Sequence, residues 1–215
     1  MAHALIFWGG WEGHDPEKMS AIFERELSAR GMNIHRENSM SPLDDAEYLK
    51  SLDLMVPVWT MGEISPQQQA NVASAVAGGM GIGGVHGGMC DAFRGNLDWQ
   101  WMTGGQFVGH PHVGEYTVRL TAQSSHITAP LPSHFTYDSE QYYMLVDPDV
   151  NVLADMVYEH HSSRAIMPVI WTRRWYEGRV FNSSLGHCAE EFERYPAVLE
   201  MTIRGLLWSA RRGEG

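Results

Sequence analysis

The sequence predicts an α/β fold: a mostly parallel sheet with helices on both faces and an insertion over the ligand-binding edge, in a single domain spanning residues 1–215. Three observations support this prediction. Short apolar runs typical of buried strands alternate with amphipathic helical segments. The connections between them are short, which favours right-handed parallel crossovers. With 215 residues, 44% of them hydrophobic, the chain suffices for one sizeable core but not for two ordinary domains.

Strands and helices alternate regularly in the first 88 residues. Asp15 is positioned to cap a helix whose first residue is Pro16, and Ser65-Pro66 begins another helix in the same way. Gly31 ends the first of these helices and Gly78-Gly79 ends the second, as expected where a helix stops. The expected strands are residues 4–8, 32–36, 52–58 and a glycine-rich strand that ends at His86.

Residues 89–150 lose this alternation and are rich in Gly, His, Trp and Tyr, so we interpret them as the insertion over the ligand edge. Within it, residues 115–120 alternate like a half-exposed strand. Regular structure resumes with strands at residues 151–153, 165–171 and 178–182, and the last strand pair is expected to end at His187. A final amphipathic helix begins near Pro196.

Composition and charge exclude several classes of function. Fifteen Lys and Arg against 26 Asp and Glu give a net charge of −11, which repels polyanions, so no nucleic-acid partner is expected. No apolar run is long enough to span a bilayer and no signal peptide precedes the first strand, so a cytoplasmic protein without a membrane partner is expected. Phosphate-binding glycine motifs are missing, so no nucleotide cofactor is expected. The composition does not decide whether the chain forms a homo-oligomer.

Two histidines are expected at the carboxyl ends of strands, where open α/β sheets bind their ligands. His86 lies in the sequence GVHGG, where a sharp strand-to-helix turn would project it into a solvated cleft. His187 follows the small residues of another strand end and should face the same cleft. Glu140, in the polar segment at residues 137–143, is the favoured acid. His86, Glu140 and His187 are therefore the candidate catalytic residues.

Imidazole and carboxylate groups also bind divalent metals. A zinc or manganese ion held by two or three of His14, His86, His187 and Glu140 is chemically sensible. The same predicted edge carries further polar and aromatic side chains that are candidates for contacting a small-molecule ligand: Trp11, Glu12, His14, Trp59, His110 and Tyr142.

Other interpretations stay open from the residues alone. His86 is alternatively a hydrogen-bonded structural histidine. Cys90 is alternatively a displaced nucleophile for an amidase or peptidase, although a lone cysteine is more often a small buried apolar residue. A non-catalytic sugar-binding or regulatory module would use the same cleft aromatics without turnover.

Several motifs together resemble the trehalose-utilisation (ThuA-like) family. They are GGWEGH at residues 9–14, GGVHG at 83–87, GGQFVGHP at 104–111, PVIWTR at 168–173, GRVF at 178–181, SLGH at 184–187 and RGLLW at 204–208. Their order and spacing fit that family from one end of the chain to the other.

The resemblance implies a fold related to class I glutamine amidotransferases, with His86 in place of the nucleophilic cysteine. It also implies sugar catabolism on 3-keto-glycosides, by elimination and hydration or by isomerisation through an enolate. By matching positions, the family's site residues correspond to His14, His86, His110, Glu140 and His187.

Overall fold

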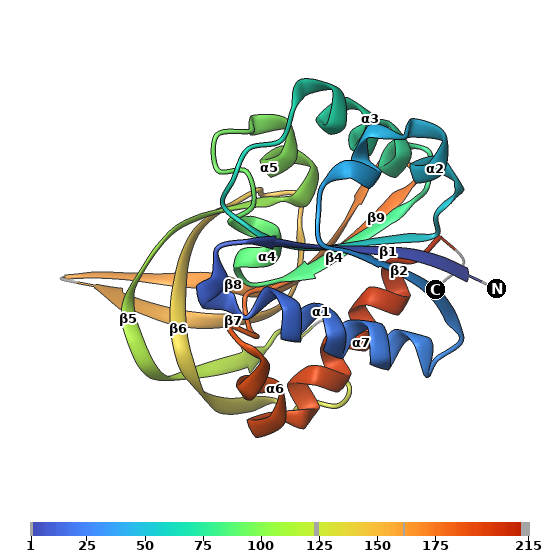
Figure 1. The fold of residues 1–215 in the computed structure, drawn as a ribbon. Helices are drawn as coiled ribbons and strands as arrows, with labels where there is room; N and C mark the ends of the chain where they lie inside the picture. Colours follow the sequence, from blue (N-terminus) through green and yellow to red (C-terminus); the bar gives the residue numbers. More distant parts are fainter. Residues whose placement is uncertain (1, 123–124, 161, 212–215) are drawn as a thin grey trace.

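A nine-stranded sheet forms the centre of the computed structural model, which describes residues 2–122, 125–160 and 162–211 (Figure 1). The strand order is β2-β1-β3-β4-β9-β8-β7-β5-β6. The first five strands in this order run parallel: β2 (Met32–Glu37), β1 (Ala2–Gly10), β3 (Leu54–Thr60), β4 (Gly81–Val85) and β9 (Gly178–Ser183). The rest are antiparallel: β8 (Ser163–Trp175), β7 (Asn151–His160), β5 (Gly105–Leu120) and β6 (His134–Val146).

The predicted α/β class with helices on both faces is confirmed, but the mostly parallel sheet is wrong because half of the sheet is antiparallel. The segment interpreted as an irregular insertion contains β5 and β6, which pair from Gly105–Val146 to Arg119–His134 and extend the same sheet. Register shifts near Gly109 interrupt the alternation of burial in β5. The predicted strand at residues 115–120 is confirmed as the regular end of β5, but the bulged part before it lacks a two-residue period, so the sequence pattern did not reveal it.

Helices cover both faces of the parallel half (Figure 1). On one side lie α1 (Pro16–Ser28), α6 (Ala189–Arg194) and α7 (Pro196–Ser209), and on the other lie α2 (Ala46–Ser51), α3 (Pro66–Ala77) and α5 (Leu97–Thr103). Three one-turn elements complete the order: η1 (Glu12–His14), η2 (Ser41–Asp44) and α4 (Gly87–Cys90). Because η1 and α4 follow β1 and β4 directly, both sit at the carboxyl edge of the parallel strands.

The sequence signals at the helix starts are mostly confirmed. Ser65 and Gln68 form a reciprocal capping box at the start of α3. Pro196 begins α7 as expected. Asp15 is different: it precedes α1, but its side chain makes no capping hydrogen bond and its φ angle is 48°. Its left-handed backbone instead turns the chain sharply between η1 and α1.

Close packing between α7 and β9 depends on Gly205. A Cβ atom at this position would lie 2.3 Å from ring carbons of the fully buried Phe181. We expect Gly205→Ala to destabilise the fold by roughly 1–3 kcal/mol through overpacking, despite the better helix propensity of alanine. Urea unfolding at neutral pH measures the change. Gly95→Ala is the matched control, since no atom lies within 4 Å of its Cβ position; an equal loss in both variants would contradict the packing argument.

Candidate active site

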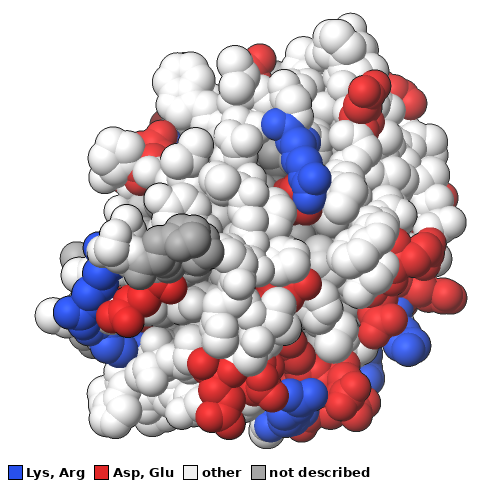
Figure 2. Space-filling model, turned by 90° about the vertical axis from the view of Figure 1, so that its left-hand side faces the viewer, with Lys and Arg blue, Asp and Glu red and all other residues white. Residues whose placement is uncertain are grey.

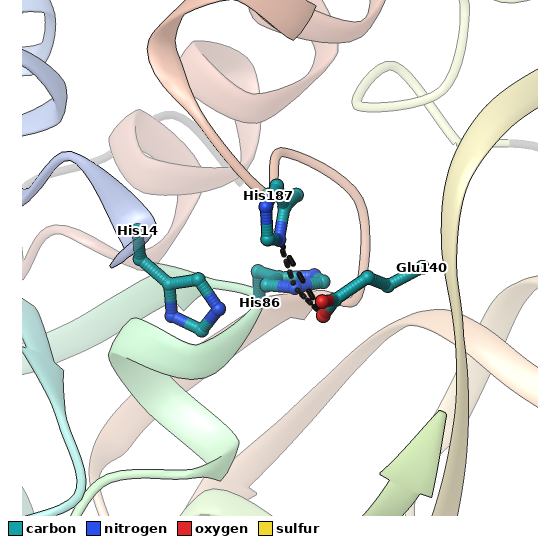
Figure 3. A group of neighbouring side chains, drawn as sticks. All are labelled: His14, His86, Glu140 and His187. Carbon is teal, nitrogen blue, oxygen red and sulfur yellow. Dashed lines mark hydrogen bonds and ion pairs between the residues drawn. The ribbon is translucent and has the colours of Figure 1, made fainter. Parts of the chain in front are cut away.

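Four side chains from distant parts of the sequence converge at the carboxyl edge of the parallel strands (Figure 3). His14 ends η1 after β1, His86 lies between β4 and α4, and His187 follows β9. Glu140 comes from β6 in the antiparallel half. One ligand atom from each of the four lies within 4.8 Å of the others, so this group can hold a metal ion. The residues predicted as catalytic and as metal ligands are therefore brought together.

The turn at His86 has a strained backbone. Its φ and ψ angles are 47° and −135°. Gly87 makes room for the neighbouring imidazole, because a Cβ atom there would lie 2.3 Å from His14 Cε1. Asp15, Met61 and Phe93 also have positive φ angles near this edge of the sheet. Backbone strain of this kind clusters at functional sites.

His86 is buried rather than exposed to a solvated cleft, so that part of the sequence prediction is wrong. Only 2% of its surface is exposed, because the Tyr142 ring packs on it with centroids 3.9 Å apart. Its Nδ1 lies 2.9 Å from the carbonyl oxygen of Ser184. A carbonyl only accepts, so Nδ1 carries a proton, and Nε2 is the ring nitrogen that faces the cluster.

The atoms facing Nε2 are a carboxylate oxygen, which accepts hydrogen bonds, and the nitrogen of a second imidazole, which donates or accepts according to its protonation. Glu140 Oε2 and His187 Nδ1 each lie 3.2 Å from His86 Nε2, and these two atoms are 3.4 Å apart. Several lone pairs at such distances need a proton or a cation between them. This donor set, imidazoles plus a carboxylate, fits zinc or manganese.

The electrostatics of the cluster follow from its burial and its mutual contacts. Burial and the neighbouring imidazoles of His86 and His187 lower the pKa of His14 to about 3, so His14 is neutral at physiological pH. Its Nδ1 contacts the Thr60 hydroxyl at 2.8 Å, which leaves Nε2 for a ligand. Burial alone would raise the pKa of Glu140, but hydrogen bonds from His187 and His86 outweigh it and hold that pKa well below its usual range. The hydrogen bond to Glu140 raises the pKa of His187.

The residues predicted to contact a ligand divide into two groups. His110 lies at the exposed side of the cluster, with Nε2 3.6 Å from Glu140 Oε1. Trp11 is half exposed and meets the His14 ring edge-on at 4.7 Å. Tyr142 packs on His86 and is buried.

The remaining two candidates, Glu12 and Trp59, make no contact with the cluster that matches those of Trp11, His110 and Tyr142. Glu12 is exposed in η1, and among the described residues its side chain has no hydrogen bond or ion pair to the cluster. Trp59 packs against Phe7 and over Gly9, and its buried Nε1 has no partner among the described residues.

His187 lies four residues beyond the end of β9, in a loop rather than at a strand end.

Sequence reasoning missed the residues that hold this loop in place. The backbone N–H of His187 donates to Glu191 Oε2 at 3.0 Å, and the Tyr137 hydroxyl donates to the same oxygen at 2.5 Å. The Tyr137 oxygen also accepts from the backbone N–H of Gly186. Tyr137 is 49 residues from Gly186 in the sequence and Glu191 lies within a short helix, so no local motif identifies them.

Cys90 does not have the environment of a nucleophile. The thiol is buried and donates to Asn182 Oδ1 at 3.1 Å. Burial, aided by the negative charge of Asp91, raises its pKa far above the ordinary value, so the reactive thiolate is strongly disfavoured. This observation argues against the amidase or peptidase interpretation.

A cavity of about 10 Å³ adjoins the cluster, lined by apolar and glycine residues together with Thr60, His14, His86 and His187. This volume holds no more than one water molecule. Trp11 and His110 are the exposed side chains beside the cluster.

The fold and the cluster together define an α/β protein with a candidate metal centre at the carboxyl edge of its sheet. The chain belongs to the ThuA family, described as trehalose utilisation, whose profile matches residues 3–209. This supports a role in sugar metabolism. No curated protein matches the chain at a significant level.

Solved structures show the same fold at low sequence identity. A ThuA-like protein from Bacteroides uniformis aligns over 99% of this chain and 94% of its own, with a TM-score of 0.78 and 18% identity. One from Parabacteroides merdae aligns over 99% and 91%, with a TM-score of 0.74 and 16% identity. A β-galactosidase from Bacillus circulans sp. alkalophilus aligns over 95% of this chain and 30% of its own, with a TM-score of 0.61 and 11% identity. In the part of the chain that the structure describes, no helix is long and apolar enough to cross a membrane.

The metal site predicts stabilisation by divalent ions. After treatment with chelator, added Zn²⁺ or Mn²⁺ should raise the Tm of the protein, since a ligand at 100 times its Kd stabilises the fold by about 2.7 kcal/mol. His14→Ala should remove most of this increase, because it deletes one of the four ligands. His134→Ala, on an exposed histidine at the start of β6, is the control. An equal metal-induced increase in all three proteins would contradict the proposed ligand set.

The coupling of Glu140 and His187 predicts a pH window for stability in the metal-free protein. The lowered pKa of Glu140 gives stabilisation that is present above its unfolded value of about 4.3 and lost as the pH falls. The raised pKa of His187 gives stabilisation that is present below about 6.5 and lost as the pH rises through the folded value. The difference in urea midpoint between wild type and Glu140→Gln should therefore be largest near pH 5.5.

Urea unfolding in chelator at about pH 3.5, 5.5 and 8.5 measures this window. Glu63→Gln, which replaces an exposed carboxylate, is the control and should show a small, flat difference. A Glu140→Gln difference that is independent of pH would show that the ion pair with His187 does not stabilise the fold.

Proposed function

We propose that this protein is an enzyme of sugar metabolism that acts on 3-keto-glycosides through an enolate, releasing the C1 substituent by elimination, followed by hydration. The observation that carries the proposal is the convergence of His14, His86, Glu140 and His187 in a member of the trehalose-utilisation family. A keto group at C3 acidifies the proton at C2, so the reaction needs a base, an acid and stabilisation of negative charge, and it needs no covalent nucleophile.

The chain's own residues supply these requirements. His14, His86, His187 and Glu140 would hold the ion, which when bound stabilises the negative charge of an enolate oxygen. Among the imidazoles around Glu140, His110 is the most exposed, and its Nε2 faces Glu140, which can orient the ring. We assign His110 to take the proton from C2.

His110 also returns the proton that it takes from C2. The His110 imidazolium formed in the first step donates its proton to the departing C1 oxygen, and the electron pair left at C2 forms the C1–C2 double bond of an enone. Water then adds across this bond to give the free keto-sugar. An isomerisation at C2 would share the enolate and return the proton to C2 from the other face.

The decisive test is incubation of the purified protein with a 3-keto-disaccharide, with and without chelator, followed by detection of released sugar and enone. His110→Ala should lower kcat by at least about 10²-fold, the lower range for a positioned proton-transfer group. Glu140→Gln should lower turnover similarly while its fold is retained, as shown by an unchanged circular dichroism spectrum. Thermal stabilisation by the sugar without any turnover would support a non-catalytic binding module instead.

A further inference from the structure

A single arginine lies beside the aromatic side chains that cover the cluster. The side chain of Arg94 is 48% exposed, while its partner Asp91 is 2% exposed. Asp91 accepts hydrogen bonds from Nε and, at 2.8 Å, from Nη2 of Arg94. The buried carboxylate of Asp91 therefore binds one edge of the Arg94 guanidinium through two hydrogen bonds and fixes its orientation.

The backbone around this pair is held rigidly. The N–H of Met61 donates to the Asp91 carbonyl at 2.9 Å, and the N–H of Phe93 donates to the Met61 carbonyl at 3.1 Å. Both Met61 and Phe93 have positive φ angles, 61° and 52°, which are costly for side chains of this size. Phe93 is itself buried against Trp99. The fold thus accepts strain in the segment that presents Arg94.

Ring contacts connect Arg94 to the candidate active site. Its guanidinium carbon lies 5.4 Å from the centroid of Phe107, and the Phe107 ring lies 4.5 Å from that of Tyr142. Tyr142 in turn packs on His86 at 3.9 Å, and Phe107 also contacts His110 at 5.8 Å. Arg94 is therefore two aromatic rings away from His86, outside the cluster but on the same wall.

The free edge of this guanidinium suits hydroxyl groups. Among the described residues none accepts a hydrogen bond from Nη1 of Arg94, so its two N–H groups are available. The carboxylate of Asp91 offsets the positive charge of Arg94. The free N–H groups therefore offer hydrogen-bond donors to a ligand without strongly attracting anions. Figure 2 shows that the face on the β5–β6 side is mostly neutral apart from a basic side chain in its upper centre, with acidic and basic residues around its borders. Such a surface favours an uncharged ligand.

We infer that Arg94 binds hydroxyl groups on the departing half of an uncharged disaccharide, while the oxidised ring lies at the histidine cluster. This inference rests on the proposed function, because it assigns the leaving group to a subsite beside the same centre. Arg94 acts as a specificity-determining residue, not as a proton-transfer group, since Phe107 and Tyr142 separate it from His86.

The test compares two substrates that share the oxidised ring, a 3-keto-disaccharide and the corresponding 3-keto methyl glycoside. Arg94→Gln should lower the ratio of kcat/KM for the disaccharide to that for the methyl glycoside by about tenfold, the effect expected for one or two hydrogen bonds to a charged donor. Arg94→Lys retains the charge beside Asp91 but loses the planar fork, and it should lower the ratio by a similar factor. Arg25→Gln, on an exposed arginine of α1 paired with Glu26, should leave the ratio unchanged.

A binding measurement separates this inference from the proposed function. Calorimetry with the unoxidised parent disaccharide should show about tenfold weaker binding to both Arg94 variants than to wild type. The Tm of each variant should equal that of wild type, so that the weaker binding does not come from a loss of stability. If wild type converts neither keto-substrate, the proposed function fails, and the calorimetry alone decides the role of Arg94. Equal disaccharide affinity in wild type and both variants, or an equal kcat/KM loss on both substrates, would overturn the inference.

Discussion

The hydrogen bond between His86 Nδ1 and the Ser184 carbonyl is the interaction on which the site depends. It connects the turn after β4 to the loop after β9, and it fixes the tautomer of a ring that is almost fully buried. With Nδ1 occupied, Nε2 must face Glu140 and His187. The chemistry available at this edge, whether proton transfer or metal binding, follows from that single orientation.

The mixed sheet explains how a carboxylate reaches this centre. The parallel half brings together histidines from the segments that follow its strands, as open α/β sheets commonly do with polar groups at their carboxyl edge. Glu140 comes from β6, at the far end of the antiparallel half, which must curve back for the two to meet (Figure 1). The antiparallel strands thus complete the site as well as extending the sheet. This division lets one half of the fold supply the imidazoles and the other supply the acid and the aromatic wall.

Burial and mutual contacts shift the pKa values of three members of the cluster. His14 is kept neutral, Glu140 is kept ionised, and His187 gains affinity for a proton from its contact with that carboxylate. The groups therefore depend on one another, since removing one changes the protonation of the rest. The network of Tyr137 and Glu191, which anchors the loop of His187, limits how far that loop can relax. A preorganised polar site of this kind is what enolate chemistry requires.

The sequence by itself determined the parallel half of the fold and most of the cluster, because these depend on local signals. Apolar runs defined β1 and β3, the capping box placed α3, and the position of His86 after a buried strand located the edge. In the antiparallel half the sequence indicated parts of β5, β7 and β8 as strands, but only the tertiary structure decided their antiparallel pairing and the existence of β6, because the register shifts in β5 obscure its two-residue period. The burial of His86 and the position of Arg94 were likewise invisible in the sequence. Both depend on rings and carboxylates that long-range strand pairing brings together, and no local pattern encodes such contacts.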